Sequence, residues 1–435
     1  MTARLRLKLS ATLTLGAIFC VASLPAQATE GYFQHGYGAI SKALAGTGAA
    51  YSQDASSMAT NPAGLVNVDN QVNFDVSFFS PHRSFTGSGA SGFPFAVPTG
   101  SYDSENTLFF VPTAAVSYRI DDVSTAGVAL YGNGGMNTEW KGTPRPASEC
   151  PPSGGLGVYC AGKAGVDLTQ IFLQPTYARE IFDGVSVGVG PIFAAQFFQA
   201  HGVQSFQGFS SDPNNLSNNG HDESYGIGAR FGIQAQLPAN VRIGAAYQLR
   251  TFMTQFHDYA GLFAEQGAFD IPPALQVGLS WQPMDNLTLL LDYRRIWYSD
   301  VDSVGNPGPA SFADIATRGL GGDNSVGFGW DNINIIKVGA QFQPDDQWTL
   351  RAGFAYNENP IDSSEVMFNI LAPGVVKYHI TGGVEYKLND AISLLLSGMY
   401  APSTSVSGPN PFNSAQTIKL EMYQYEVTAG LAWRF

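Results

Sequence analysis

The chain has 435 residues, of which 13% are charged, and its formal net charge at pH 7 is -13. This acidic balance argues against a nucleic-acid partner, whose phosphates require a basic surface. The charged fraction lies well below the roughly 25% of soluble domains, while aromatic residues reach 12% and glycine contributes 49 residues. Because no apolar run after the N-terminus has the length of a membrane helix, the composition favours a transmembrane β-barrel over a helical membrane protein.

The N-terminus has the pattern of a secretory signal peptide. Three basic residues precede an apolar run over residues 9–24, and an A-x-A cleavage site follows at residues 26–28. This order of segments predicts a signal peptide over residues 1–28, which we exclude from the fold. The three basic residues leave with it, so the formal net charge changes from -13 to -16.

From residue 71 onward the sequence resolves into segments in which apolar and polar residues alternate, the pattern of strands with one apolar face. In residues 225–237 the odd positions are apolar or aromatic, and the even positions are glycine, arginine or glutamine. About fourteen such strands are expected, over residues 71–86, 107–120, 124–133, 166–181, 184–200, 221–237, 240–257, 271–283, 286–300, 329–343, 346–357, 375–388, 390–401 and 420–435. Alternation also fits a soluble β-sandwich or propeller, so it does not choose between these folds.

The links between the strands alternate in length. After every second strand the link is a tight turn, as at residues 121–123 and 182–184, whereas the other seven links are long and irregular. Short periplasmic turns, long outer loops and an even number of strands are features of bacterial outer-membrane barrels. A propeller would show a repeat of blade length, which the sequence lacks. Residues 71–435 are therefore predicted to form an all-β, transmembrane antiparallel β-barrel in the bacterial outer membrane.

Aromatic residues mark one edge of the expected barrel. On the apolar face, just before a tight turn or the chain end, lie Tyr118, Tyr177, Trp281, Phe342, Tyr386 and Trp433. Aromatic rings are favoured at membrane interfaces, so these residues predict an aromatic girdle. The alternating last strand ends in Phe435, which resembles the assembly signal of outer-membrane barrels.

Residues 29–70 do not alternate and are rich in small residues, so they cannot form a core of their own. They contain Ala49 and Ala50, then Asp54 and Ala55, then the motif Asn61, Pro62, Ala63 and Gly64. With this spacing, the strand number and the terminal phenylalanine, the mature chain resembles the FadL/TodX family of outer-membrane transporters for long-chain fatty acids and aromatic hydrocarbons. The resemblance implies that residues 29–70 form a hatch that plugs the barrel lumen and contains the motif.

The resemblance also implies that an inward kink of the third strand opens the barrel wall, so that substrate leaves sideways into the membrane. An oily molecule crossing an aqueous channel would lose about 0.8 kcal/mol per exposed methylene, which lateral exit avoids. The third expected strand runs into Gly132, Asn133, Gly134 and Gly135. Glycines within a strand permit bulges and kinks, so we expect the opening there. A plain turn into the outer loop is the alternative.

Strand parity places several basic residues on the lumen face, namely Arg230, Arg250, Arg294, Lys337 and Arg351. An inward cation can bind the carboxylate of a fatty acid, and arginine does so through two hydrogen bonds. The alternative is a salt bridge within the barrel to one of the carboxylates that parity also turns inward. These are Asp292, Glu385 and Glu426.

Parity also turns four phenylalanines inward, namely Phe109, Phe172, Phe198 and Phe252. A water-filled porin would not place phenylalanine there, so these residues predict an apolar ligand pocket. Packing against the hatch is the alternative.

Other residues carry little chemistry. Cys150 and Cys160 lie in the second outer loop, in an oxidising compartment, so we expect a disulfide. The six histidines lack metal-ligand spacing, and the G-x-G sequences lie in strands with no helix following, so no metal and no cofactor is expected. No serine lies in a nucleophile elbow, and we expect no enzyme. An outer-membrane lipid-modifying enzyme that uses His201 or His221 across strands is the alternative of a different class.

The sequence therefore predicts a monomeric outer-membrane protein, surrounded by lipid, that lets hydrophobic small molecules cross passively. Passive transport follows from the lack of any nucleotide-binding motif. The expected substrates are long-chain fatty acids or related compounds, with hatch-gated lateral exit through the barrel wall. Uptake of aromatic or alkane hydrocarbons is the alternative, because both kinds of substrate need the same apolar pocket and differ mainly in whether a cation meets a carboxylate.

Overall fold

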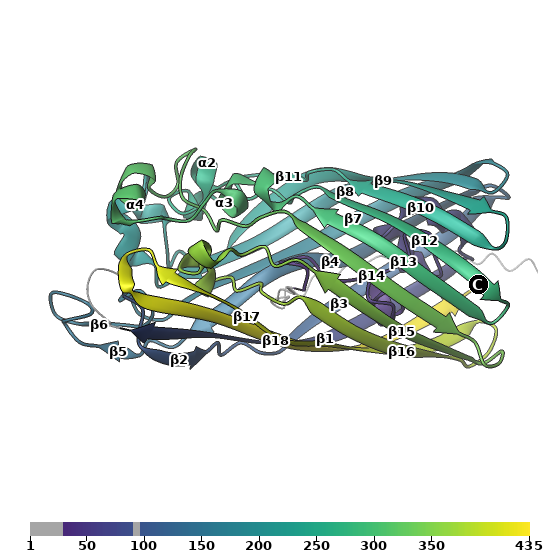
Figure 1. The fold of residues 1–435 in the computed structure, drawn as a ribbon. Helices are drawn as coiled ribbons and strands as arrows, with labels where there is room; N and C mark the ends of the chain where they lie inside the picture. The colour runs from purple at the N-terminus through teal and green to yellow at the C-terminus, as the bar shows by residue number, and fades with distance from the viewer. Residues whose placement is uncertain (1–28, 90–95) are drawn as a thin grey trace, which may run out of the picture.

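The structure is a computed structural model that describes residues 29–89 and 96–435. The expected signal peptide, residues 1–28, lies outside the described residues. A ring of antiparallel strands closes into a barrel with tight turns at one end and long loops at the other, and the C-terminus lies at the tight-turn end (Figure 1). Fourteen strands form the wall once the short β2 and β11 are set aside, which confirms the predicted fold.

The wall strands follow one another around the ring in chain order. They are β1 (Gln71–Gly89), β3 (Phe109–Asp121), β4 (Ser124–Trp140), β7 (Ala164–Phe182), β8 (Val185–His201), β9 (Asp222–Leu237), β10 (Val241–Gln248), β12 (Ala274–Met284), β13 (Leu287–Ile296), β14 (Ile333–Phe342), β15 (Trp348–Asn357), β16 (Tyr378–Lys387), β17 (Ile392–Asn410) and β18 (Asn413–Arg434). The first strand pairs with the last, from Gln71 opposite Arg434 to Gly89 opposite Gln416. This pairing is needed because lipid cannot hydrogen-bond a free strand edge.

Short elements complete the barrel and its loops. Two of them extend wall strands: β2 (Gly100–Asp103) pairs with β1, and β11 (Phe252–Met253) continues β10 against β9. The outer loops contain β5 (Pro144–Arg145), β6 (Gly155–Leu156), η3 (Gln204–Phe209), η4 (Pro213–Asn215), η5 (His257–Tyr259), α2 (Ala264–Gly267), η6 (Tyr298–Asp300), α3 (Asp302–Gly305), α4 (Phe312–Arg318), η7 (Ser363–Glu365) and η8 (Phe368–Ile370). None of the helices in the described residues is long and apolar enough to cross a membrane.

One outer link differs from its prediction. The link between the last two strands was expected to be long and irregular, but β17 and β18 continue as a hairpin until Asn410 lies opposite Asn413. Residues 402–419 consist mainly of serine, threonine, glycine, proline and other polar residues. They therefore lack the apolar alternation that marks a strand with one lipid-facing side, although the backbone pairing continues.

The alternation gives the two faces of the wall as predicted. On β9, the side chains of Tyr225 and Ile227 are 55% and 58% exposed on the outside, whereas Arg230 and Gln234 are each 4% exposed on the inside. The girdle residue Trp433 is likewise exposed, at 49%. The outer surface therefore presents apolar and aromatic side chains to lipid, and the lumen is lined mainly by polar ones.

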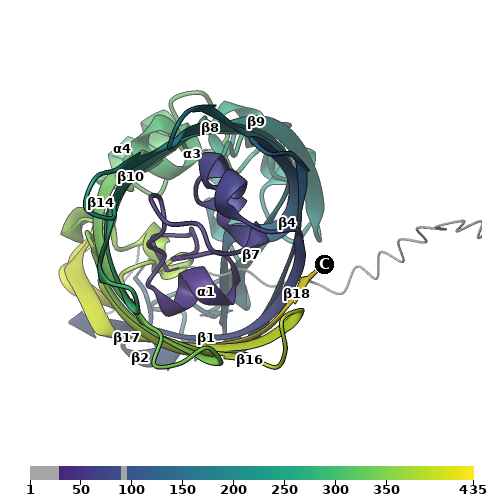
Figure 2. The same cartoon turned by 90° about the vertical axis from the view of Figure 1, so that its right-hand side faces the viewer.

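Residues 29–70 lie inside the barrel, where they form α1 (Gly38–Ala43), η1 (Ala55–Ala59) and η2 (Pro62–Asn67) (Figure 2). Asn61 begins η2 as its N-cap, and its Oδ1 accepts a hydrogen bond from the Ala63 N–H at 3.0 Å. Its Nδ2 donates to the carbonyl oxygens of Ala49, at 2.6 Å, and Ile233 of the wall, at 3.1 Å. The Asn-Pro pair thus starts a helix, as these residues commonly do, and binds the hatch to β9.

Two wall glycines allow this close approach. A Cβ on Gly232 would clash with Oδ1 of Asn61, and a Cβ on Gly188 would clash with the backbone of Pro62 and Ala63. Only glycine therefore lets the hatch motif lie directly against β8 and β9.

We expect Gly232→Val to displace the hatch motif from the wall, because the added side chain overpacks the contact at a cost of about 1–3 kcal/mol. The measurement is protease protection of the hatch in the folded barrel. Gly398→Val is the matched control. Gly398 lies on the exposed outer face of β17, and the nearest atom to an added Cβ would be 3.8 Å away. Equal protection of the hatch in the two variants would contradict the prediction.

Candidate functional site

An apolar pocket lies among the outer loops, at the loop end of the barrel. It encloses about 570 Å³ of empty space, part of it open to solvent. Five different outer loops contribute one aromatic ring each, and the top of β8 contributes another; these are Tyr159, Phe198, Phe206, Phe263, Phe328 and Phe368. Ser303 is the one lining side chain that is mainly polar, so the lining suits a hydrophobic molecule.

The predicted pocket phenylalanines separate into different environments. Phe198 lines the outer pocket. Phe172 is buried against Tyr131, with ring centroids 5.7 Å apart, and Tyr131 in turn contacts Tyr37 of the hatch. Phe109 is buried at the top of β3, near Phe79. The structure therefore brings only Phe198 to the outer pocket, and a ligand role for Phe109 and Phe172 stays a prediction.

The inward orientation predicted for Phe252 is wrong: its side chain is 64% exposed on the outside. Gln248 lies opposite Arg230, but Phe252 lies opposite Ile227, so one extra residue enters this strand between β10 and β11. A shift of one residue reverses the face of every side chain beyond it. Arg250 lies within this irregular segment, so strand parity does not fix the face on which its side chain lies.

Arg250 pairs with a carboxylate, but not with one of the predicted wall carboxylates. Its Nε lies 2.7 Å from Asp270 Oδ2, and its Nη1 donates to the carbonyl oxygen of Asp300 at 2.7 Å. Its guanidinium also lies 5.8 Å from the centroid of the outward Phe252 ring. Arg250 therefore binds outer-loop residues.

Two predicted lumen cations bind a carboxylate of the hatch. Arg294 Nη1 lies 2.8 Å from one carboxylate oxygen of Glu30, and Lys337 Nζ lies 2.6 Å from the other. All three side chains are at least 95% buried. The predicted alternative, a salt bridge within the barrel, is thus confirmed for Arg294 and Lys337. The carboxylate, however, is Glu30 of the hatch and not one of the predicted wall carboxylates. Breaking such a buried pair by removing one partner costs about 3–5 kcal/mol.

The other two lumen cations differ from each other. Arg351 pairs with Glu385 at 2.8 Å, as the salt-bridge alternative expected. Arg230 instead donates to neutral acceptors: Tyr131 Oη at 3.2 Å, Gln174 Oε1 at 3.4 Å, and Gln248 Oε1. Among the described residues, no carboxylate lies within ion-pair distance of Arg230. Together with Arg294 it lines a small lumen cavity.

The remaining wall carboxylates hold the hatch. Asp292 Oδ2 accepts hydrogen bonds from the backbone N–H groups of Gly48, at 3.1 Å, and Ala49, at 2.9 Å. Glu426 forms a buried ion pair with Lys42 of α1. The hatch is therefore bound to the wall at several points by charged and polar groups.

The third strand of the barrel, β4, contains a bulge at the predicted position. Gly132 lies opposite Ile171 of β7, but Gly134 lies opposite Gln170, so Asn133 is an extra residue. Because β4 continues as a strand to Trp140, the alternative of a plain turn at this point is wrong. Bulges bend a strand locally, as expected for a kink in the wall.

The wall is interrupted on the other side of this bulge. The pairing of β3 with β4 ends at Thr113 opposite Tyr131, although both strands continue beyond that pair. We call this gap the seam, formed by residues 109–112 of β3 and 132–136 of β4. At its outer end, the Glu105 N–H donates to the Glu139 carbonyl oxygen at 2.9 Å. Arg83 also donates there, to the carbonyl oxygen of Asn137.

Hatch residues bind the edge of β4 that the seam leaves free. The Gly135 N–H donates to the Tyr32 carbonyl oxygen at 2.9 Å, and the Gln34 N–H donates to the Asn133 carbonyl oxygen at 3.1 Å. Gln34 Nε2 donates to the Gly132 carbonyl oxygen at 2.5 Å. The hatch therefore supplies hydrogen bonds that a neighbouring strand supplies elsewhere in the wall.

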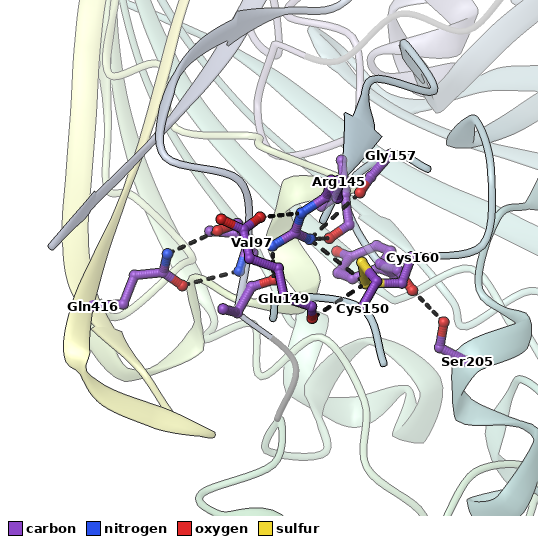
Figure 3. The surroundings of a disulfide bond; sticks show 11 residues. Val97, Arg145, Glu149, Cys150, Gly157, Cys160, Ser205 and Gln416 are labelled. Atoms are coloured by element: carbon purple, nitrogen blue, oxygen red, sulfur yellow. Dashed lines mark hydrogen bonds and ion pairs between the residues drawn. A yellow bond between two sulfur atoms is a disulfide. The ribbon is translucent and has the colours of Figure 1, made fainter. Parts of the chain in front are cut away.

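Cys150 and Cys160 are joined by a disulfide in the second outer loop (Figure 3). Arg145 lies beside it and donates to the carbonyl oxygens of Val158, at 2.9 Å, and Ala96, at 2.6 Å. The next loop is bound as well, since Ser205 donates to the carbonyl oxygen of Tyr159. Because Tyr159 lines the outer pocket, this loop forms part of the pocket wall.

The two histidines of the enzyme alternative, His201 and His221, each contact one carboxylate. His201 Nε2 lies 2.8 Å from Glu139 Oε2, and His221 Nε2 lies 3.1 Å from Asp167 Oδ2. Within residues 29–89 and 96–435, no group of three or more His, Cys, Asp or Glu side chains is arranged to hold a metal ion.

Glu30, the partner of Arg294 and Lys337, was not predicted from the sequence. The available signal was its isolation: it is the one acidic residue between the predicted cleavage site and Gln53. Arg83, which lies inward on β1, and the amide groups of Gln174 and Gln248 around Arg230 were not predicted either.

Comparison with known proteins gives consistent matches over nearly the whole chain. A family model described as outer membrane protein transport protein (OMPP1/FadL/TodX) matches residues 19–407. The long-chain fatty acid transport protein of Escherichia coli (strain K12) is 22% identical over 433 residues, which cover 91% of this chain and 90% of the relative. That of Salmonella typhi is 22% identical over 437 residues, with the same coverage.

Solved structures share the fold. The Pseudomonas putida toluene transporter TodX superimposes with a TM-score of 0.65 at 16% identity, covering 92% of this chain and 99% of that one. A Pseudomonas aeruginosa FadL homologue gives a TM-score of 0.67 at 16% identity, covering 93% and 100%. At these identities the likeness establishes the architecture alone.

We expect hatch docking to weaken as the pH rises from about 5 to 8. Burial, and then the neighbouring Asp75 carboxylate, raise the pKa of Asp54 in the hatch to about 7. An undocked aspartate has a pKa of about 4, so the docked state binds the proton more tightly, and stability is lost as the pH rises through the window between these values. Hydrogen exchange of the hatch, corrected for the intrinsic pH effect, should accelerate by about tenfold or more.

The variant Asp54→Asn should reduce this pH dependence, whereas Asp69→Asn, at an exposed hatch position, should leave it unchanged. A wild-type hatch with equal protection at both pH values would contradict the prediction.

Proposed function

Because the chain belongs to the OMPP1/FadL/TodX family of outer-membrane transport proteins, we propose that it carries long-chain fatty acids or related hydrophobic compounds passively across the outer membrane as a monomer, with hatch-gated lateral exit through the barrel wall. Its relatives are transporters or channels rather than enzymes. The observation that carries the proposal is the seam between β3 and β4, where the wall lacks strand pairing and hatch residues cover the free edge.

Entry takes place at the outer pocket. Its aromatic lining removes a hydrophobic molecule from water, at a gain of roughly 25 cal/mol per Å² of apolar surface buried. Phe198 extends this lining into the barrel, since it lies on a wall strand while most other pocket residues lie on loops. The pocket is therefore placed to collect substrate outside and present it to the lumen.

Arg230 is the lumen cation best placed to meet a substrate carboxylate. It faces a cavity, and its hydrogen-bond partners are neutral, whereas Arg294 and Lys337 already share Glu30. A carboxylate that reached the cavity would complete an ion pair that the described residues do not provide. Arginine suits this role because its guanidinium binds a carboxylate through two parallel hydrogen bonds.

Exit takes place through the seam. Leu108 and Phe110 are exposed to lipid beside it, at 57% and 47%. A molecule that passes between β3 and β4 therefore reaches the membrane beside these apolar side chains. It does not cross the periplasmic end of the lumen, where polar residues of the hatch and wall meet.

Uptake of aromatic or alkane hydrocarbons is the second candidate, and the outer pocket favours it. The pocket lining contains no charged side chain, so nothing there selects for a carboxylate. A neutral hydrocarbon would use the same pocket and seam without contacting Arg230.

Deletion of Asn133 should abolish uptake while the barrel still folds. The deletion removes the extra residue of the bulge and keeps the existing β4–β7 partners on both sides, so β4 straightens toward β3 and closes the seam. Asn133→Ala, which keeps the extra residue, is the matched control. Uptake of labelled oleate is measured in cells that lack their own transporter, with heat-modifiable gel mobility as the test of folding. Full uptake by the folded deletion variant would exclude exit through the seam.

Arg230→Gln should lower uptake of oleate by about tenfold or more and leave uptake of oleyl alcohol unchanged, because only the acid loses a charge-assisted hydrogen bond. Arg250→Gln is the control, since Arg250 binds outer-loop residues. Equal uptake of oleate by wild type and Arg230→Gln would show that Arg230 does not bind the carboxylate, and would favour neutral substrates.

A further inference from the structure

Glu30 is the only carboxylate paired with Arg294 and Lys337 in the described residues, and it belongs to the hatch and not to the wall. Its two oxygens are shared between the two cations, at 2.8 and 2.6 Å, in a site closed to solvent. Arg294 also lines the cavity that contains Arg230. A molecule bound to Arg230 would therefore lie next to one of the two cations that hold Glu30.

The same hatch segment reaches the seam. Glu30 lies two residues before Tyr32, whose carbonyl oxygen accepts the hydrogen bond from Gly135 in β4. Tyr298 connects Glu30 with Tyr32, because its hydroxyl donates to the Glu30 carbonyl oxygen and accepts from the Tyr32 N–H. Glu30 and the residue that binds the seam are therefore held by the same side chain.

We propose that Arg294 and Lys337 form a carboxylate-exchange site, in which Glu30 is an internal ligand that the carboxylate of an incoming amphiphile replaces. This inference rests on the proposed function and adds to it the step that releases the hatch. Exchange of one carboxylate for another leaves the charge of the site unchanged. A neutral ligand that displaced Glu30 would leave two buried cations without a counter-ion, which is strongly unfavourable.

The displaced Glu30 cannot remain buried, because an ionised carboxylate without a partner is expensive to keep from water. Its segment must therefore move toward solvent, and the hydrogen bonds of Tyr32 and Gln34 to β4 break. The Arg294–Lys337 site thus links recognition of a carboxylate to opening of the wall, whereas a neutral compound passes the seam only when the hatch opens without this exchange.

The test is hydrogen exchange, by mass spectrometry, of hatch residues 30–37 in the full mature protein in lipid nanodiscs, with decanoate and decanol as probes. In the wild type, decanoate should accelerate exchange by about tenfold, a typical size for coupling between sites, and decanol should not. In Glu30→Gln, exchange should already be fast without ligand and should not respond to decanoate. Equal effects of the two probes, or no effect of decanoate on the wild type, would overturn the proposal.

Glu426→Gln is the matched control, because it removes the other buried ion pair between hatch and wall, to Lys42. It should loosen the hatch but keep the response to decanoate; loss of that response would show general loosening and not exchange. If Glu30→Gln does not fold, Glu30→Asp keeps the charge with a shorter reach, and decanoate should act on it at lower concentration than on the wild type. An unchanged concentration would also refute the proposal.

Oleate and oleyl alcohol uptake by cells separates this inference from the proposed function. Uptake without a hatch response to decanoate would reject the exchange site alone, whereas uptake of neither compound would reject the proposed function.

Discussion

Every backbone polar group within the membrane must find a partner inside the protein, because lipid offers none. The ring of fourteen strands meets this requirement by pairing its first strand with its last. The seam is an exception, since β3 and β4 separate above Thr113 and Tyr131. There the hatch provides hydrogen-bond partners for the free edge of β4 through Tyr32 and Gln34, so the docked hatch completes this edge of the wall.

Charge holds the hatch in this position. A barrel lumen lined by polar residues cannot bind a plug through apolar contacts alone, and this one uses Glu30, Lys42 and the backbone next to Asp292. Buried ion pairs contribute little net stability compared with apolar packing, but they are costly to break unpaired. They therefore suit the role proposed for the hatch, which stays docked in the absence of substrate and exchanges its partners in the presence of a carboxylate.

The sequence predicted the wall well because apolar and polar residues alternate with a period of two in a strand that has one side in lipid. Most of the wall strands keep this alternation over their length. It failed where the period was broken or carried no apolar signal. One extra residue before Phe252 reversed its face, and the polar hairpin of β17 and β18 was mistaken for an irregular link. The bulge at Asn133 was expected, because glycines on both sides of it permit one.

The ion pairs were beyond sequence reasoning for a different reason. Parity turned Arg294 and Lys337 inward, but their partner lies on a segment without periodicity, more than 260 residues away in the chain. Only the folded barrel brings Glu30 to them. Arg230 illustrates the same limit, since its neutral partners come from three different strands.

The outer pocket is assembled from separate loops, each of which contributes one aromatic ring, above a wall that contributes one more. The loops begin and end on paired strands and do not determine how the ring closes. We therefore expect that their sequences can diverge, or be exchanged between homologues, without disturbing membrane insertion. Changes in the loops can therefore alter ligand preference while the wall strands keep their pairing. This separation suits the barrel as a scaffold on which new binding specificities are engineered.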